Sequence, residues 1–327
     1  MNQASVSEQD KDMNLELTDC ACSPNIRTGS DSESDGKSKI SSSRIDSKST
    51  VRLRMSGLIA RILVKGGALI TLAVIFTIVG YILIKGIPNI KLNLFEWEYN
   101  SENVSMMPAI VNTIVMVVVT LVIAVPIGIG AAVYMVEYVS KGSILAKVIK
   151  LAIETLAGVP SIVYGLFGAL FFVKFLEFQL SILAGCLTLA IMILPLVMGT
   201  TEEALRMVPI SYKEGSLALG ATRVQTIFKV QLGPATPGIL SGVIIAVGRI
   251  VGESAALVFT SGTIAKPLVS MLSSGRTLSV HMYVLSGEGF HIEQTYATAT
   301  VLMVLVLILN GLSTLIAKKL GSKNENE

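Results

Sequence analysis

The sequence predicts an all-α, polytopic membrane protein with six transmembrane helices. Of its 327 residues, 52% are hydrophobic and only 15% are charged, whereas about a quarter of the residues of a soluble domain carry a charge. The apolar residues gather in long runs, and a helix needs about 20 of them to cross a bilayer. Lipid is therefore the expected environment of most of the chain.

Six apolar runs are candidates for the transmembrane helices. The second run is too long for one straight crossing, and we expect it to kink or end around Pro126, Gly128 and Gly130. In the third run, Gly158 and Pro160 predict a helix break near one end, either as a packing kink or as part of a gate lining. The runs cover residues 66–84, 104–136, 155–173, 178–201, 236–260 and 294–317.

The basic residues are distributed unequally between the two sides of the predicted helices. From Arg44 onward, sixteen lysines and arginines fall on the side that contains both termini, and five fall on the other side. The short segment around Trp97 on the second side is acidic. Because cytoplasmic loops carry the excess of Lys and Arg, we expect both termini to be cytoplasmic.

Composition and the apolar runs divide the chain into four parts. The first part is rich in Ser, Asp and Lys, has almost nothing to bury, and is predicted to be a disordered cytoplasmic tail. The second holds one transmembrane helix and an outer loop, the third holds the other five helices with a long cytoplasmic loop at 201–233, and the last is a cytoplasmic tail. Their bounds are residues 1–50, 51–104, 105–317 and 318–327.

No pattern in the sequence indicates catalysis or a cofactor. Cys20 and Cys22 are close together, but no nearby His or second Cys pair completes a tetrahedral metal site. A Walker A motif, which would bind the phosphates of ATP, is absent. We therefore expect a transport subunit that binds no cofactor or metal and hydrolyses no ATP itself. Its expected surroundings are the lipid bilayer, and we expect no nucleic-acid partner.

The cytoplasmic loop between the fourth and fifth runs carries strong local signals. Ser211 and Glu214 have the spacing of a capping box, Gly220 fits the end of the helix that follows, and Thr222 with Gln225 forms a second capping box. Two short helices are therefore predicted. They either pack on their own helix ends or dock on a cytoplasmic partner, because several of their apolar residues need cover: Leu217, Leu219, Ile227 and Phe228.

Two charges fall inside the fifth run. Arg249 lies near its middle, and Glu253 follows four residues later, on the same face of a continuous helix. Charges within a transmembrane segment are costly and are functional candidates by default. Either the pair neutralises itself and holds helices together, or Arg249 faces the translocation path and binds an oxyanion. In the second case Glu253 would hold the guanidinium in place and keep binding weak enough for release.

The loop also resembles a known motif. Glu214-Gly215-Ser216, Gly220 and Leu232 resemble the "EAA" loop of ATP-binding-cassette (ABC) importer permeases, although Gly215 and Ser216 replace the usual Ala-Ala and Gly233 replaces Pro. The wider sequence resembles the PstA-type permeases of phosphate importers and, in part, the PstC type. Four segments carry this resemblance in the same order as in that family: 158–165, 200–206, 248–253 and 281–283.

The resemblance implies a type I ABC importer permease fold with cytoplasmic coupling helices, and import of inorganic phosphate. It implies that the region from Glu214 to Gly220 docks on the ATPase. The implied partners are a sister permease of the PstC type, two PstB-type subunits that use ATP, and an external PstS-type phosphate-binding protein. Two rivals remain: a permease for another oxyanion such as molybdate or sulfate, and an ion-gradient-driven secondary transporter. The second rival often shows inverted repeats, and no clear repeat is present here.

Overall fold

The computed structural model describes residues 47–100, 102–139 and 142–324, so residues 1–46 of the tail predicted at 1–50 lie outside it, and the last four residues of that predicted tail begin a helix. Contacts divide the chain into a unit ending at Gly66, inside the first helix, and a second unit from Gly67 onward. No strand occurs in the described ranges. The helices are α1 (Ser47–Gly86), α2 (Met107–Glu137), α3 (Ile144–Ala157), α4 (Ser161–Gly168), α5 (Ile182–Met207), α6 (Ile210–Ala218), α7 (Arg223–Thr226), α8 (Leu232–Gly252), α9 (Ala255–Thr260), α10 (Leu278–Glu288) and α11 (Ile292–Asn324), with π-helical turns at Ala169–Phe175 and Ile227–Gln231 and 3-10 turns at Ile87–Asn89 and Leu92–Phe95.

Five of the helical segments in the described ranges are long and apolar enough to cross a membrane. The pair of helices at 144–157 and 161–175, whose axes bend by 101° at a short break, makes a sixth span when the two are counted together. The prediction of an all-α polytopic membrane protein is therefore confirmed, with five unbroken spans and this bent pair in the place of the sixth. The five unbroken spans are Arg61–Asn89, Met107–Glu137, Ile182–Met207, Arg223–Gly252 and Ile292–Lys319.

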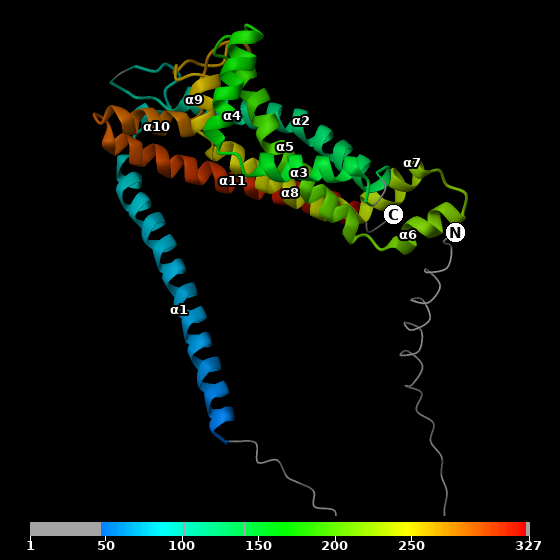
Figure 1. Cartoon of the computed structure of the whole chain (residues 1–327). Helices are drawn as coiled ribbons and strands as arrows, with labels where there is room; N and C mark the ends of the chain where they lie inside the picture. Colours follow the sequence, from blue (N-terminus) through cyan, green and yellow to red (C-terminus); the bar gives the residue numbers. More distant parts are fainter. Residues whose placement is uncertain (1–46, 101, 140–141, 325–327) are drawn as a thin grey trace, which may run out of the picture. The chain divides into compact units, whose positions relative to one another are not determined.

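Helix α5 is the centre of the second unit and packs against α2 and α8, while α11 packs on α8 (Figure 1). Small residues allow the backbones to approach closely. A Cβ atom on Gly128 of α2 would lie 2.8 Å from Val197 Cγ1, and one on Gly242 of α8 would lie 2.0 Å from Thr200 Oγ1. Since lipid provides little hydrophobic drive between helices, this close packing is what holds them together.

The second run is one uninterrupted helix. Helix α2 continues through Pro126 to Glu137, so of the two outcomes expected around Pro126, Gly128 and Gly130, a kink or an end, the end is wrong. A proline is tolerated inside a transmembrane helix because neighbouring helices and local adjustments compensate for the missing hydrogen bond. Gly128 instead allows the close contact with α5.

The third run is broken more sharply than a single kinked span. Helix α3 begins at Ile144, well before the predicted start, and the side chain of Ser143 caps it by accepting a hydrogen bond from the Ala146 N–H at 3.1 Å. After the break the chain continues as Ser161–Phe175. The hydroxyl of Tyr164 donates a 2.7 Å hydrogen bond to the carbonyl of Leu156 across the break and fixes the corner.

The fifth run is also discontinuous. Helix α8 ends at Gly252, and α9 starts three residues later, so a single helix over 236–260 is not formed. Helix α9 packs on α4 through glycines: a Cβ on Gly165 would lie 2.8 Å from Ala256 Cα, and one on Gly168 would lie 2.7 Å from Thr260 Cγ2.

The helix ends also differ from the predicted boundaries. Helix α5 continues to Met207 and α8 begins at Leu232, so the segment between them is 208–231. Helix α11 extends to Asn324, into the segment predicted as a tail. Figure 1 shows α6 and α7 at the opposite end of the helix bundle from α9 and α10.

Candidate functional site

The first candidate site is the segment 208–231, which we call the coupling segment. Its first helix, α6, starts directly after Pro209, and no side-chain cap is present. Ser211 therefore lies inside the helix, and the predicted capping box of Ser211 with Glu214 is wrong. Proline favours the start of a helix through its fixed φ, so the helix begins before the serine.

The end of α6 agrees with the prediction. Gly220 adopts φ +85°, which is left-handed, and its N–H donates to the Leu217 carbonyl at 3.0 Å. The next N–H, of Ala221, donates to the Ser216 carbonyl at 3.2 Å. This pair of bonds is a Schellman motif. It explains why glycine occupies position 220.

The predicted second capping box is confirmed. Thr222 Oγ1 accepts a 3.3 Å hydrogen bond from the Gln225 N–H, and Gln225 Oε1 accepts a 3.0 Å bond from the Thr222 N–H. Ser216 and Thr226 then join the two short helices through a 3.0 Å hydroxyl–hydroxyl contact. Ser216, one of the residues in the permease-like motif, therefore has a structural partner within the chain.

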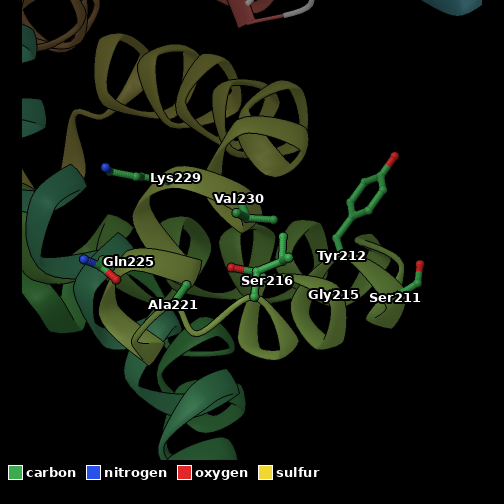
Figure 2. Close-up of a pocket in the computed structure, with 9 residues that line it drawn as sticks. Ser211, Tyr212, Gly215, Ser216, Ala221, Gln225, Lys229 and Val230 are labelled. Atoms are coloured by element: carbon green, nitrogen blue, oxygen red, sulfur yellow. The ribbon is translucent and has the colours of Figure 1, made fainter.

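A groove of about 570 Å³ lies in the coupling segment, between α6 and the turns that follow it (Figure 2). Tyr212, Gly215 and Ser216 line it from α6, and Lys229 and Val230 line it from the other side. Around it, Glu214 is exposed, Leu219 is 92% exposed and Phe228 is 68% exposed. Of the apolar residues of this segment, Ile227 is buried within the chain. The segment therefore buries only part of its apolar surface against the rest of the chain.

Sequence reasoning missed the residue that attaches α6 to the membrane helices. Glu137, the last residue of α2, has a side chain that is 4% exposed. Its Oε2 accepts from Lys213 Nζ of α6 at 2.6 Å, and its Oε1 accepts from Gln231 Nε2 at 2.9 Å. One carboxylate therefore connects α2, α6 and the approach to α8. The signal in the sequence was an acidic residue at the end of an otherwise uncharged run.

The second candidate site surrounds Arg249. This residue lies in the last turn of α8, not in the middle of a span, and its side chain is exposed. Glu253 follows the end of the helix, in extended conformation, and its Oε1 accepts a 3.1 Å hydrogen bond from the Ala256 N–H. In the described part of the chain Arg249 forms no ion pair. The prediction that Glu253 holds Arg249 on one helix face is wrong, because the helix ends between them; Glu253 instead caps α9.

The corner at Gly158 and Pro160 lies near this arginine. Tyr164, which fixes the corner through its hydrogen bond to Leu156, packs in the same hydrophobic cluster as Ile250 and Val251, which follow Arg249 in the chain. The structure thus brings the predicted helix break and the predicted pathway arginine into one region, while the coupling segment lies at the other end of α5 and α8. No group of three or more His, Cys, Asp or Glu able to hold a metal ion occurs in the ranges described.

Comparison with known proteins gives consistent matches. The model of the family "Binding-protein-dependent transport system inner membrane component" matches residues 124–322. The "Probable ABC transporter permease protein YqgI" of Bacillus subtilis (strain 168) is 32% identical over 276 residues, covering 77% of this chain and 93% of that protein. The "Phosphate transport system permease protein PstA" of Pasteurella multocida (strain Pm70) is 33% identical over 233 residues, covering 70% and 82%.

Solved structures show the same fold. A bacterial ABC transporter involved in the import of the acidic polysaccharide alginate matches with a TM-score of 0.55, at 16% identity, over 81% of this chain and 99% of that one. A chain of the MetNI methionine ABC transporter, in an inward-facing conformation, matches with a TM-score of 0.52, at 20% identity, over 66% and 94%. The expected ABC importer permease fold is confirmed.

Proposed function

This chain belongs to the family of binding-protein-dependent transport system inner membrane components, and from that premise we propose that it forms half of the pore of an ATP-driven importer of inorganic phosphate. The observation that carries phosphate as the substrate is the 33% identity to a protein named PstA over 82% of its length. The family and the membrane spans make the chain a multi-pass membrane transport subunit.

Arg249 is the residue that we propose contacts the anion. A guanidinium offers a planar fork of donors that matches the oxygens of phosphate, and this one is exposed on α8 with no carboxylate paired to it in the described ranges. Because charged residues in membrane spans almost always face away from lipid, we expect this arginine to face the pore or the sister subunit. Glu253 has a separate role in this proposal: it orders the start of α9 at one end of the path.

The coupling segment is the proposed docking site for the ATPase. Its groove and its exposed Leu219 and Phe228 provide apolar contact area, and Glu214 provides an unburied charge beside them. ATP would be bound and hydrolysed by two separate PstB-type subunits. Movement of α6 would reach the membrane helices through the Lys213–Glu137 ion pair.

The proposed assembly also contains a PstC-type sister permease and an external PstS-type binding protein. The excess of basic residues on the side of the coupling segment supports a cytoplasmic location for this side and for both termini. The four-part organisation, with a Ser-rich tail at 1–50 and the five-helix transport region at 105–317, belongs to the same proposal.

Uptake of labelled phosphate by cells that depend on this importer tests the substrate. We expect uptake to require the ATPase and to resist a large excess of sulfate or molybdate. Strong inhibition by either of those anions would assign the permease to another oxyanion. Uptake that persists with a catalytically dead ATPase would indicate a secondary transporter.

Docking is tested separately by co-purification with the co-expressed ATPase. We expect Glu214→Ala to reduce recovery of the complex, whereas Glu154→Ala on the exposed face of α3 serves as a matched control and leaves recovery unchanged. Equal recovery of the complex with both variants would remove Glu214 from the docking site.

A further inference from the structure

A second group of basic and aromatic residues lies at the opposite end of the bundle from the coupling segment. Arg276 lies one residue before Thr277, the N-cap of α10, and His281 lies in the first turn of that helix. Tyr99 lies on the segment before α2, and its ring covers the guanidinium of Arg276, with Cζ 4.5 Å from the ring centroid. The ring of His281 meets the same tyrosine edge-on, at 6.2 Å between centroids.

These residues are buried although they are polar. Arg276 is 3% exposed and His281 is fully buried. The backbone of Arg276 is held firmly: its N–H donates to Ile264 O at 3.1 Å, and its carbonyl accepts from Asn112 Nδ2 of α2 at 3.2 Å. The guanidinium is therefore fixed by the fold at this position and does not simply extend into solvent.

Two donor atoms of this guanidinium have no acceptor among the described residues. Nε and Nη2 of Arg276 are both buried and make no hydrogen bond there. Within the described ranges no carboxylate oxygen lies within 4.0 Å of the guanidinium. These two nitrogens form one edge of the guanidinium, the edge that binds two oxygens of a carboxylate or phosphate in parallel. A buried charge without a partner costs several kcal/mol in general, so an anion bound here would be stabilising.

The surroundings of this edge favour an anion as well. Within the described ranges, both ring nitrogens of His281 are buried and make no hydrogen bond. Burial is the largest cause that lowers the pKa of His281, to about 3, and the charge of Arg276 is the second. The imidazole ring is therefore neutral and can donate one N–H. The N-terminus of α10, an eleven-residue helix, lies directly after Arg276 and adds positive electrostatic potential.

We infer that Arg276 and His281, beneath the ring of Tyr99, form a binding site for a phosphate-type oxyanion at the end of the bundle opposite the coupling segment. Arg276 binds two anion oxygens through Nε and Nη2, and His281 donates to a third. Because Tyr99 covers the guanidinium and is itself half-buried, its ring moves aside when the anion enters. That the physiological anion is free phosphate rests on the proposed function. The anion site itself rests only on the geometry of these residues.

Binding of labelled inorganic phosphate to the purified full chain in detergent tests the site, in the absence of ATP and partners. An Arg249→Gln background removes the proposed pathway contact. In that background we expect saturable binding that Arg276→Gln weakens at least about tenfold, because a charge-assisted bidentate pair is lost. Arg276→Lys, which keeps the charge without the fork, is expected to weaken binding by several-fold. A short-chain phosphatidylglycerol is the second probe. If it displaces labelled phosphate and its binding depends on the same residues, a lipid headgroup is the source of the bound phosphate group.

Equal phosphate binding with and without Arg276→Gln would overturn the site, as would the absence of binding of either probe in the Arg249→Gln background. Thermal unfolding without phosphate provides a second test: Arg276→Gln is expected to leave the melting temperature unchanged or raise it, because a buried charge without a partner is removed. A clear fall would identify Arg276 as a structural residue and overturn the site. Since no transport is measured, failure of phosphate uptake would contradict the proposed function alone.

Discussion

Replacement of Glu137 and Lys213 tests how the coupling segment is attached to the membrane helices. The Glu137 side chain is 4% exposed and the Lys213 side chain 32% exposed, and their charged atoms are 2.6 Å apart. Loss of one partner of a fully buried pair costs roughly 3–5 kcal/mol. Because solvent reaches a third of the lysine, we expect less: about 1.5–3 kcal/mol for Glu137→Gln or Lys213→Met, the range for hydrogen bonds to charged groups.

A double-mutant cycle separates this interaction from other effects of the substitutions. The exposed pair of Lys150 and Glu154, with side chains 68% and 63% exposed and charged atoms 3.9 Å apart, is the matched control. We expect a coupling energy of about 1–3 kcal/mol for the first pair and about 0.3–0.5 kcal/mol for the control.

The energies can be measured by unfolding the purified permease in mixed micelles of increasing SDS content. The fluorescence of Trp97, the single tryptophan of the chain, follows the transition. In proteoliposomes that contain the whole importer, Lys213→Met should raise the number of ATP molecules hydrolysed per phosphate imported, because α6 is no longer fixed to α2. Equal coupling energies for both pairs, or an unchanged ratio, would refute this account of the attachment.

Four further predictions follow from the geometry. Arg249→Ala and Arg249→Lys should each abolish phosphate uptake while the complex still assembles, and normal uptake by the alanine variant would contradict the pathway assignment. Gly220→Ala should destabilise the end of α6 by about 1–2 kcal/mol because φ is +85°. Gly215→Ala is the control: it lies inside α6 and meets open space, so alanine should stabilise the helix by about 0.5–1 kcal/mol, and equal unfolding midpoints for both would contradict this. Tyr164→Phe should cost about 0.5–1.5 kcal/mol through loss of its bond across the helix break, and an unchanged unfolding midpoint would count against that bond. Burial is the main cause that holds the pKa of His281 at about 3, below its usual 6.5. Below about pH 6.5 the unfolded chain therefore binds a proton that the folded chain does not, and the folded state loses stability as the pH falls. His281→Gln should flatten this loss when melting temperatures are measured as a function of pH, and an identical pH profile would argue against it.

The membrane spans could be predicted because hydropathy over about 20 residues depends little on tertiary context. Local capping signals were nearly as informative: Gly220 and the Thr222–Gln225 box occur as the spacing predicts. The box at Ser211 failed because two helix-start signals competed, and Pro209 precedes the serine. Spacing alone does not rank such signals.

The break after Gly252 could not be predicted from the run of apolar residues. The charge spacing of Arg249 and Glu253 implied a helical turn, but the chain leaves the helix between them, and Glu253 caps α9 instead. The sequence pattern also could not predict contacts between residues that are distant in sequence. Glu137 and Lys213 are 76 positions apart, and Tyr99 and Arg276 meet only through the fold.

The proposed role of this chain as part of an ATP-driven phosphate pore can be tested in one reconstituted system. Labelled phosphate uptake is measured in proteoliposomes that contain this permease, its sister permease, the two ATPases and the phosphate-binding protein. We expect uptake that needs ATP and all components and that disappears with Arg249→Ala. Undiminished uptake without this permease, or ATP-driven uptake of sulfate or molybdate in place of phosphate, would contradict it.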